Sequence, residues 1–301
     1  MKILVFDIGG TAIKYGSCVD GCLMDVKEVP TEAHKGGRHI MDTLISLVGK
    51  ENGYDAIGVS SSGQVHAEKG HIIYANSNIP GDTGTEIKKE LETLFGVPVA
   101  VENDVNAAAL GEAVYGAARE MDSFLCLTYG TGIGGAIVEH KTVYHGSGYS
   151  AAEFGAIVTH GEAKRAGTDY FDGCYERYAS TTALVQKAMA YDSTLTNGRK
   201  LFERLEETKD PRLQEILDDW IHEIMLGLAT LTHIFNPSCI LLGGGVMVQP
   251  KVIHQVQALV DRYVMPSFAN VRILPAALGN QAGLLGANYL AEQLCYWNSN
   301  K

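Results

Sequence analysis

Basic residues are scarce in this chain of 301 residues: 24 Lys and Arg stand against 35 Asp and Glu, a formal net charge of −11 at pH 7. A negative field of this size argues against nucleic acid or an anionic membrane as a partner. Long apolar runs are also missing, because none reaches the roughly 20 residues that span a bilayer. Residues 1–7 reach an acidic side chain too early for a signal-peptide core. We therefore expect a cytoplasmic protein.

Two common cofactor-binding patterns are absent as well. The six cysteines include no C-x-x-C pair, so neither a zinc ribbon nor a redox dithiol is indicated. Scattered thiols in a cytosolic protein are most simply buried, small apolar side chains. No G-x-x-x-x-G-K-[ST] phosphate loop occurs either.

What the chain does contain is a repeated pattern of strands, turns and helices. Its length fits two lobes of roughly 100–200 residues each. Each half opens with a strand, a glycine-rich turn and a returning strand, which predicts a duplicated α/β unit. We expect strands at residues 2–7, 12–19, 22–29, 56–60, 72–74, 97–101, 123–128, 136–139, 239–242 and 271–274. We expect helices at residues 38–52, 85–95, 104–117, through most of 179–235, after 245 and from 281.

The first glycine-rich turn reads Asp7-Ile8-Gly9-Gly10-Thr11 and leads to Lys14. Glycines let backbone N–H groups approach a phosphate, and the Thr11 hydroxyl adds a donor. Asp7 is suited to hold Mg²⁺ through water, since hard cations prefer oxygen ligands. Lys14 would face a phosphate or solvent. The alternative is an ordinary hairpin turn.

A second turn, Y-G-T-G-I-G-G at residues 129–135, is not a dinucleotide fingerprint, because its spacing is wrong and a β-branched strand follows it. A strand, a glycine turn and a strand suit a second phosphate cradle, with Thr131 and Gly132 at its centre. Gly244, in the glycine triplet after a later strand, would let adenosine approach the backbone. The alternative for Gly244 is a tight connection between elements.

The segment V-E-N-D-V-N at residues 101–106 places polar side chains between a buried strand and a helix. Phosphoryl transfer to an alcohol needs a carboxylate that takes the hydroxyl proton, and Asp104 at a helix N-terminus suits that role. We expect the helix dipole to keep Asp104 ionised. The alternative is helix capping by Asn103 or Asp104, worth about 1 kcal/mol. Both roles can hold at once.

Taken together, these segments resemble the ROK family of sugar kinases. DIGGTAIK at 7–14, ENDVNAAALGE at 102–112, YGTGIGGAIV at 129–138, LLGGGV at 241–246 and NQAGLLGA at 280–287 occur in the family's order and spacing. The resemblance implies an actin-like, ribonuclease-H-like α/β fold of two lobes with the active site in the cleft between them. The N-terminal lobe would span residues 1–115, with a last helix at about 281–301 packing back on it. The C-terminal lobe, with nucleotide- and sugar-binding segments, would span residues 116–280.

The resemblance also implies a reaction, the transfer of the γ-phosphoryl group of MgATP to the 6-hydroxyl of a hexose or N-acetylhexosamine. Asp104 would be the catalytic base. The implied sugar-binding residues are Gly63, Asn78, Asn103, Asp104, Glu153 and Glu176. The implied ATP-binding residues are Asp7, Gly9, Gly10, Thr11, Lys14, Thr131, Gly132 and Gly244, with Asp7 also on Mg²⁺.

The segments HGSxxxAAE at 145–153 and CxExYAS at 174–180 slightly favour N-acetylmannosamine as the substrate. Glucose, another hexose or a glucoside stays an open alternative. The family also contains repressors with a DNA-binding domain before the first glycine turn, and we expect none here because that turn begins at residue 7. The resemblance further implies a homodimer.

The chain departs from the family at a metal site. Many members carry a His after Glu-x-Gly and a set of cysteines that bind structural zinc, whereas this chain has Ala156 and retains only Cys174. One thiolate cannot make a tetrahedral site, so we expect no structural zinc. The family's His also binds the sugar, and His160 or Gln64 could take over that role because Ala156 has no polar side chain.

Overall fold

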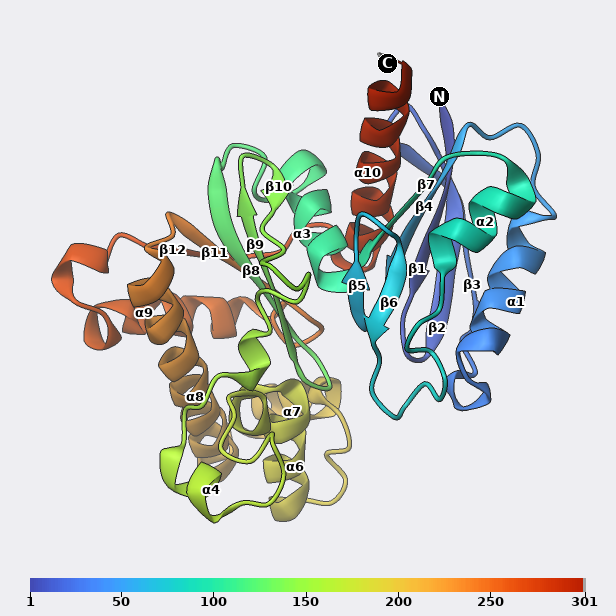
Figure 1. Cartoon of the computed structure of the whole chain (residues 1–301). Coiled ribbons are helices and arrows are strands. Elements are labelled where there is room, and N and C mark those ends of the chain that lie inside the picture. The colour runs from blue at the N-terminus through green and yellow to red at the C-terminus, as the bar shows by residue number, and fades with distance from the viewer. Residues whose placement is uncertain (300–301) are drawn as a thin grey trace. The chain divides into compact units, whose positions relative to one another are not determined.

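The structure is a computed structural model that describes residues 1–299 (Figure 1). Its contacts group the chain into two compact units. The first comprises Met1–Glu120, Lys141–Ala151 and the residues from Leu278 on, and the second comprises Met121–His140 and Ala152–Ala277.

The first unit is built on a five-stranded mixed sheet with the order β3-β2-β1-β4-β7. A hairpin joins β1 to β2 and another joins β2 to β3, whereas β4 and β7 run parallel to β1. Asp20 and Gly21 both have positive φ, as the expected turn between β2 and β3 requires. The strands are β1 (Lys2–Ile8), β2 (Ala12–Val19), β3 (Cys22–Pro30), β4 (Ala56–Ser61) and β7 (Val99–Asn103).

Side chains alternate along β1 between two apolar layers, as the period of a strand dictates. Leu4, Phe6 and Ile8 join a core with buried residues of α1 (Gly37–Val48) and α2 (Ile87–Phe95). Ile3 and Val5 point the other way and join a second core with α10 (Ala282–Ser299). The strand β1 is therefore covered on both faces.

Glycines bring α10 into backbone contact with β4 and with α3 (Asp104–Tyr115). A Cβ on Gly58 of β4 would lie 2.2 Å from the carbonyl oxygen of Ala287. A Cβ on Gly286 would lie 1.7 Å from the carbonyl oxygen of Ala107. These distances are impossible for real atoms, so only glycine permits this packing. The helix α10 therefore packs on β4 and α3 of the first unit. Residues 300–301, which the expected last helix included, lie outside the described part.

The second unit repeats four strands of this topology, with the order β9-β8-β11-β12. Again a hairpin joins the first two strands, and two parallel strands follow. The strand order confirms the predicted duplication. The strands are β8 (Ser123–Tyr129), β9 (Ile133–Glu139), β11 (Cys239–Gly243) and β12 (Arg272–Pro275), whereas the short strand β10 (Thr142–Val143) belongs to residues grouped with the first unit.

Helices of the second unit form one large core with its sheet, in which Trp220 is fully buried. The stretch 179–235, expected to be mostly helical, contains three longer helices separated at Asp192 and Lys209. The helices are α4 (Gly161–Ala166), α5 (Glu176–Ala179), α6 (Thr181–Tyr191), α7 (Gly198–Thr208), α8 (Pro211–Phe235) and α9 (Pro250–Tyr263). Within residues 1–299, no helix combines the length and apolar character needed to cross a membrane.

Two parts of the first unit differ from the expectation. The hairpin of β5 (Gln64–His66) and β6 (His71–Tyr74) contains a strand that the sequence analysis missed, because three residues are too short to show a period. Residues 141–151, expected in the second lobe, group with the first unit. These residues group with the first unit because of tertiary contacts: His145 contacts Glu102, and Ser150 donates a hydrogen bond to Gln64.

The packing of α10 yields a stability prediction. Gly286→Ala should lower the free energy of unfolding by about 3 kcal/mol or more, because its new methyl group meets backbone that cannot move aside. Gly161→Ala is the control, since its Cβ would meet nothing within 4 Å in the first turn of α4. Urea unfolding measures both. Equal stability of the two variants would contradict the packing described here.

Candidate active site

Asp7 lies at the end of β1, where the parallel register places it beside Ser60 of β4. The Ser60 hydroxyl donates a hydrogen bond of 2.7 Å to Asp7 Oδ1. Lys14 is the cross-strand neighbour of Asp7 on β2. Gly283, in the first turn of α10, packs so closely that a Cβ there would lie 2.8 Å from Asp7 Oδ1. Burial raises the pKa of Asp7, although the Ser60 hydrogen bond and the charge of Lys14 oppose the shift.

Two hydrogen bonds, one from the backbone and one from a side chain, stabilise the turn after Asp7. The Gly9 N–H donates to the Ala12 carbonyl at 3.1 Å, and Thr31 Oγ1 donates to the Gly9 carbonyl at 2.6 Å. A Cβ on Gly10 would meet nothing within 4 Å, and Thr11 is exposed. Neither glycine has positive φ, so the benefit of glycine here is open access to the backbone.

Asn103 caps α3, which decides between the two capping candidates. Its Oδ1 accepts the N–H groups of Val105 at 3.0 Å and Asn106 at 3.1 Å. Its Nδ2 donates to the Gly63 carbonyl and to Asp104 Oδ1, both at 2.9 Å. Asn103 therefore joins the loop at Gly63, which has φ +90°, to the carboxylate of Asp104.

The electrostatics of Asp104 differ from the expectation. Burial and the negative charge of Asp7 raise its pKa to about 7, although hydrogen bonds from Val105 N–H and Asn103 oppose the shift. The expectation that the helix dipole keeps Asp104 ionised was wrong, because burial and the charge of Asp7 outweigh the effects that favour the ionised form. A dipole contributes about 0.3–1 kcal/mol, whereas burial of a carboxyl can shift its pKa by several units.

Two residues of this region were missed by the sequence analysis. Glu102, 1% exposed, accepts the Asn103 N–H at 2.8 Å and the Asn106 amide at 3.1 Å. Its other oxygen lies 2.7 Å from Nε2 of His145. Glu102 stood inside the quoted segment, but nothing in the sequence shows that a residue 43 positions later is its partner.

The loop expected to face the sugar is only partly joined to this cluster. Asn78 is exposed, and its N–H bonds to the Asn76 side chain at 3.0 Å. No hydrogen bond found in residues 1–299 links Asn78 to Asn103 or Asp104. Asp82, in the same loop, is buried and accepts a hydrogen bond from Thr85 Oγ1 at 3.0 Å.

In the second unit, Glu176 lies against the glycine turn between β8 and β9. Its Oε2 accepts the Ile133 N–H at 3.3 Å, and a Cβ on Gly132 would lie 2.5 Å from the same oxygen. Burial raises the pKa of Glu176, and the charge of Glu153 adds to the shift. The structure therefore brings Glu153, Glu176 and the turn together, as the sequence analysis could not.

Tyr129, the first residue of the turn, contacts surrounding residues through both its carbonyl and its hydroxyl. Its carbonyl accepts the Thr181 hydroxyl at 3.0 Å, and its hydroxyl lies 2.8 Å from that of Tyr175. Gly244 has φ +108°, and a Cβ there would lie 2.1 Å from the Tyr129 carbonyl oxygen. Gly244 thus packs on the same turn, while Thr131 is exposed.

The side chains near Ala156 that could bind a metal contact other protein groups. Cys174 donates its thiol to the Tyr170 carbonyl at 3.4 Å. The ring of His160 stacks on Tyr178 at 3.7 Å, with Nδ1 3.0 Å from Thr159 Oγ1 and Nε2 3.5 Å from Glu223. In the loop before Cys174, the Asp172 carboxylate accepts the N–H groups of residues 168 and 169, both at 2.9 Å.

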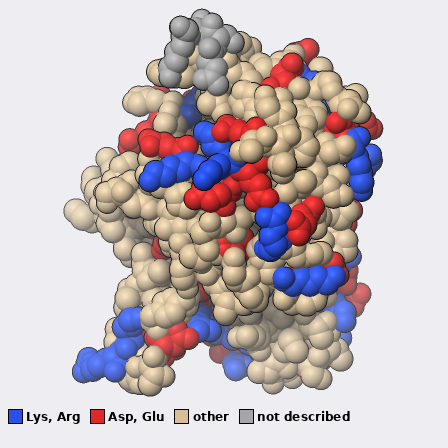
Figure 2. All heavy atoms as spheres, turned by 45° about the vertical axis from the view of Figure 1, so that its right-hand side comes forward, with Lys and Arg blue, Asp and Glu red and all other residues tan. Residues whose placement is uncertain are grey.

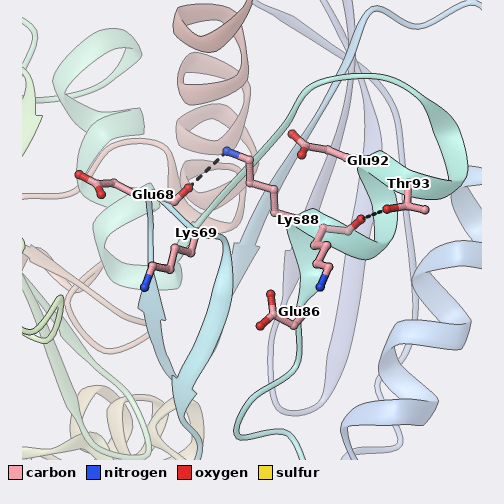
Figure 3. A pocket seen from close by; sticks show the side chains of 7 residues that line it. Glu68, Lys69, Glu86, Lys88, Glu92 and Thr93 are labelled. Atoms are coloured by element: carbon pink, nitrogen blue, oxygen red, sulfur yellow. Dashed lines mark hydrogen bonds between the residues drawn. The ribbon is translucent and has the colours of Figure 1, made fainter.

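A pocket of about 550 Å³ lies elsewhere on the first unit, between the β5–β6 turn and α2 (Figure 3). It is lined by Glu68, Lys69, Glu86, Lys88, Lys89, Glu92 and Thr93. None of these is an expected site residue. Acidic and basic side chains are mixed on the face seen in Figure 2, so that face offers no extended patch of one sign.

Nearly the whole chain is similar to known proteins. The ROK family pattern matches residues 3–294. A β-glucoside kinase of Klebsiella pneumoniae is 32% identical over 297 residues, which cover 98% of this chain and 97% of that protein.

Two solved structures are similar over almost their whole length. One is a Listeria monocytogenes protein with a provisional N-acetylmannosamine kinase name, 29% identical, with a TM-score of 0.87 and coverage of 98% of this chain and 99% of that chain. The other is a ROK family glucokinase of Streptomyces griseus in complex with glucose and AMPPNP, 28% identical, with a TM-score of 0.82 and coverage of 97% and 100%. This agreement confirms the expected actin-like α/β fold with two lobes.

The position of Asp104 yields a prediction about its titration. Asp7→Asn should lower the pKa of Asp104 from about 7 towards the ordinary value, because a neighbouring negative charge is removed. The Asp104 carboxyl resonance, followed by ¹³C NMR against pH, measures the change. Glu120→Gln, at an exposed position, is the control. An unchanged Asp104 titration in Asp7→Asn would show that the two carboxylates do not interact.

Proposed function

The chain belongs to the ROK family, and on this premise we propose that it is an ATP-dependent sugar kinase that phosphorylates the 6-hydroxyl of a hexose or N-acetylhexosamine. The observation that carries the proposal is the carboxylate of Asp104, which lies in the first turn of α3, in the same unit as the Asp7 turn, and accepts a hydrogen bond of 2.9 Å from the Asn103 amide. Burial and the charge of Asp7 raise its pKa to about 7. A general base works best when its pKa is near the operating pH.

In the proposed reaction, Asp104 takes the proton of the sugar hydroxyl as the hydroxyl oxygen bonds to the γ-phosphorus of ATP. The bond between that phosphorus and the β–γ bridging oxygen breaks, and ADP leaves with the electron pair. Asn103 orients the base, because its amide holds Asp104 Oδ1 at 2.9 Å. Positioning and electrostatics supply most of the catalysis in this class of reaction.

The residues around Asp7 fit a magnesium ion. The negative charge of Asp7 raises the pKa of Asp104, so a nearby cation would favour ionisation of Asp104, and hard cations prefer carboxylate and water oxygens. Asp7 would hold Mg²⁺ through water or through ATP. When bound, Mg²⁺ would neutralise charge on the phosphate oxygens.

We assign the other expected residues by the unit that carries them. In the first unit, Gly9, Gly10, Thr11 and Lys14 would serve the phosphates, and Gly63, Asn78 and Asn103 the sugar. In the second unit, Thr131, Gly132 and Gly244 would serve the nucleotide, and Glu153 and Glu176 the sugar. Carboxylates suit sugars because each oxygen accepts hydroxyl hydrogen bonds. Residues 156, 160 and 174 supply no zinc site in this proposal.

The choice of sugar is the finer part of the proposal. N-acetylmannosamine is favoured slightly by residues 145–153 and 174–180, and the Listeria structure bears a provisional name of that kind. Glucose and β-glucosides are the alternatives, since relatives with those names match the whole chain. A homodimer in the cytoplasm completes the proposal.

A coupled assay of ADP release tests the function. The sugars are N-acetylmannosamine, N-acetylglucosamine, glucose, mannose and a β-glucoside, each with MgATP. We expect one of them to give a kcat/KM at least tenfold above the others. ADP release that does not depend on any sugar in the panel would contradict a hexose or N-acetylhexosamine kinase.

The role of Asp104 is tested by Asp104→Asn. This change keeps the size of the side chain but removes the base, so kcat should fall by roughly 10²–10⁴-fold. Asp210→Asn is a matched control, because Asp210 accepts N–H hydrogen bonds at the start of α8 as Asp104 does at α3. Near-normal turnover of Asp104→Asn would leave Asp104 a purely structural residue.

A further inference from the structure

Glu102 is a buried carboxylate whose two oxygens contact different partners. Oε1 accepts hydrogen bonds from the Asn103 N–H and the Asn106 side chain, both in the turn that carries Asp104. Oε2 lies 2.7 Å from His145 Nε2. Without His145, Oε2 of Glu102 would be buried with no hydrogen-bond partner in residues 1–299, which is unfavourable for a carboxylate, so the contact with His145 stabilises the observed position of Glu102.

His145 is itself held in place by its neighbours in the first unit. Its ring lies 5.5 Å from that of Tyr149, which stacks on His66 of β5 at 3.8 Å. Ser150 Oγ donates to Gln64 Oε1 at 2.9 Å. These contacts join residues 145–150 to the β5–β6 hairpin, so the imidazole reaches Glu102 from a segment that packs on that hairpin.

The charges that face His145 favour its cationic form. Burial by itself would lower its pKa, but the hydrogen bond and charge of Glu102, together with the charge of Glu68, raise it. Glu68 also forms a hydrogen bond that raises the pKa of Tyr149, and it lines the pocket of Figure 3. The raised pKa of His145 and its 2.7 Å contact with Glu102 therefore favour an ion pair between the two side chains.

We propose that His145 is a positioning residue for Asp104, acting through Glu102 on the strand-to-helix turn at residues 102–106. His145 compensates the buried carboxylate, Glu102 holds Asn103 and Asn106, and Asn103 orients Asp104. The role in catalysis rests on the proposed kinase function, whereas the role in ordering the turn does not.

The test compares His145→Phe, which removes the donor, with His145→Gln, whose amide can still donate to Glu102. In His145→Phe the N–H groups of Asn103, Val105 and Asn106 should exchange with solvent at least tenfold faster, because Glu102 no longer holds the turn. The kcat should fall roughly tenfold or more, with KM for ATP within twofold, since a small misplacement of a catalytic group is costly. His145→Gln should restore both quantities towards wild type.

Two controls accompany the measurement. His39→Gln removes an imidazole that lies 3.0 Å from Glu32 at a more exposed place in the first unit, and it should change neither quantity. The N–H groups of Arg212 and Leu213 at the Asp210 cap should keep their exchange rates. If His145→Phe does not fold, His145→Asn replaces it, because its side chain is too short to reach Glu102.

Each outcome decides the proposal. Unchanged exchange overturns it, and so does faster exchange with unchanged kcat, since His145 would then be structural only. If the wild-type protein phosphorylates no sugar, the kinase proposal fails, and the exchange data alone decide whether His145 orders the turn.

Discussion

Glycine at positions 58, 111 and 286 lets the backbone of α10 lie directly on β4 and α3. A side chain at any of them would place its Cβ within 2.3 Å of a carbonyl oxygen. The same approach brings Gly283 against Asp7, so the apolar packing of the last helix also buries a carboxylate. The electrostatics of Asp7 and Asp104 therefore depend on how closely two helices and a sheet can pack.

Burial, more than the helix dipole, sets the behaviour of Asp104. Three hydrogen bonds favour the ionised form, as a helix dipole does, but loss of water and the charge of Asp7 outweigh them. A carboxyl with a pKa of about 7 can both take and release a proton near neutral pH. A helix cap in water would stay ionised and would be a weaker base, which is why the same residue types at an exposed helix start carry no such chemistry.

In the second unit, backbone pairing fixes the acidic residues proposed to bind the sugar. A bridge between Val158 and Cys174 joins the segment after Glu153 to the segment before Glu176. The Asp172 carboxylate and the stacking of His160 on Tyr178 hold the loop between them. Hydrogen bonds and ring contacts can therefore order a loop of this kind through its own side chains.

The sequence by itself determined the duplicated α/β topology, the two glycine turns and the family, because period, turn chemistry and motif order are local properties. It did not determine that Ser60 meets Asp7, that Asn103 is the cap, or that His145 partners Glu102. The pairs Ser60–Asp7 and His145–Glu102 lie 53 and 43 residues apart and are joined only by strand register and loop docking, whereas the cap at Asn103 depends on the backbone geometry at the start of α3. The pKa of Asp104 was likewise decided by tertiary structure, since desolvation depends on every atom packed around a group and not on its neighbours in the chain.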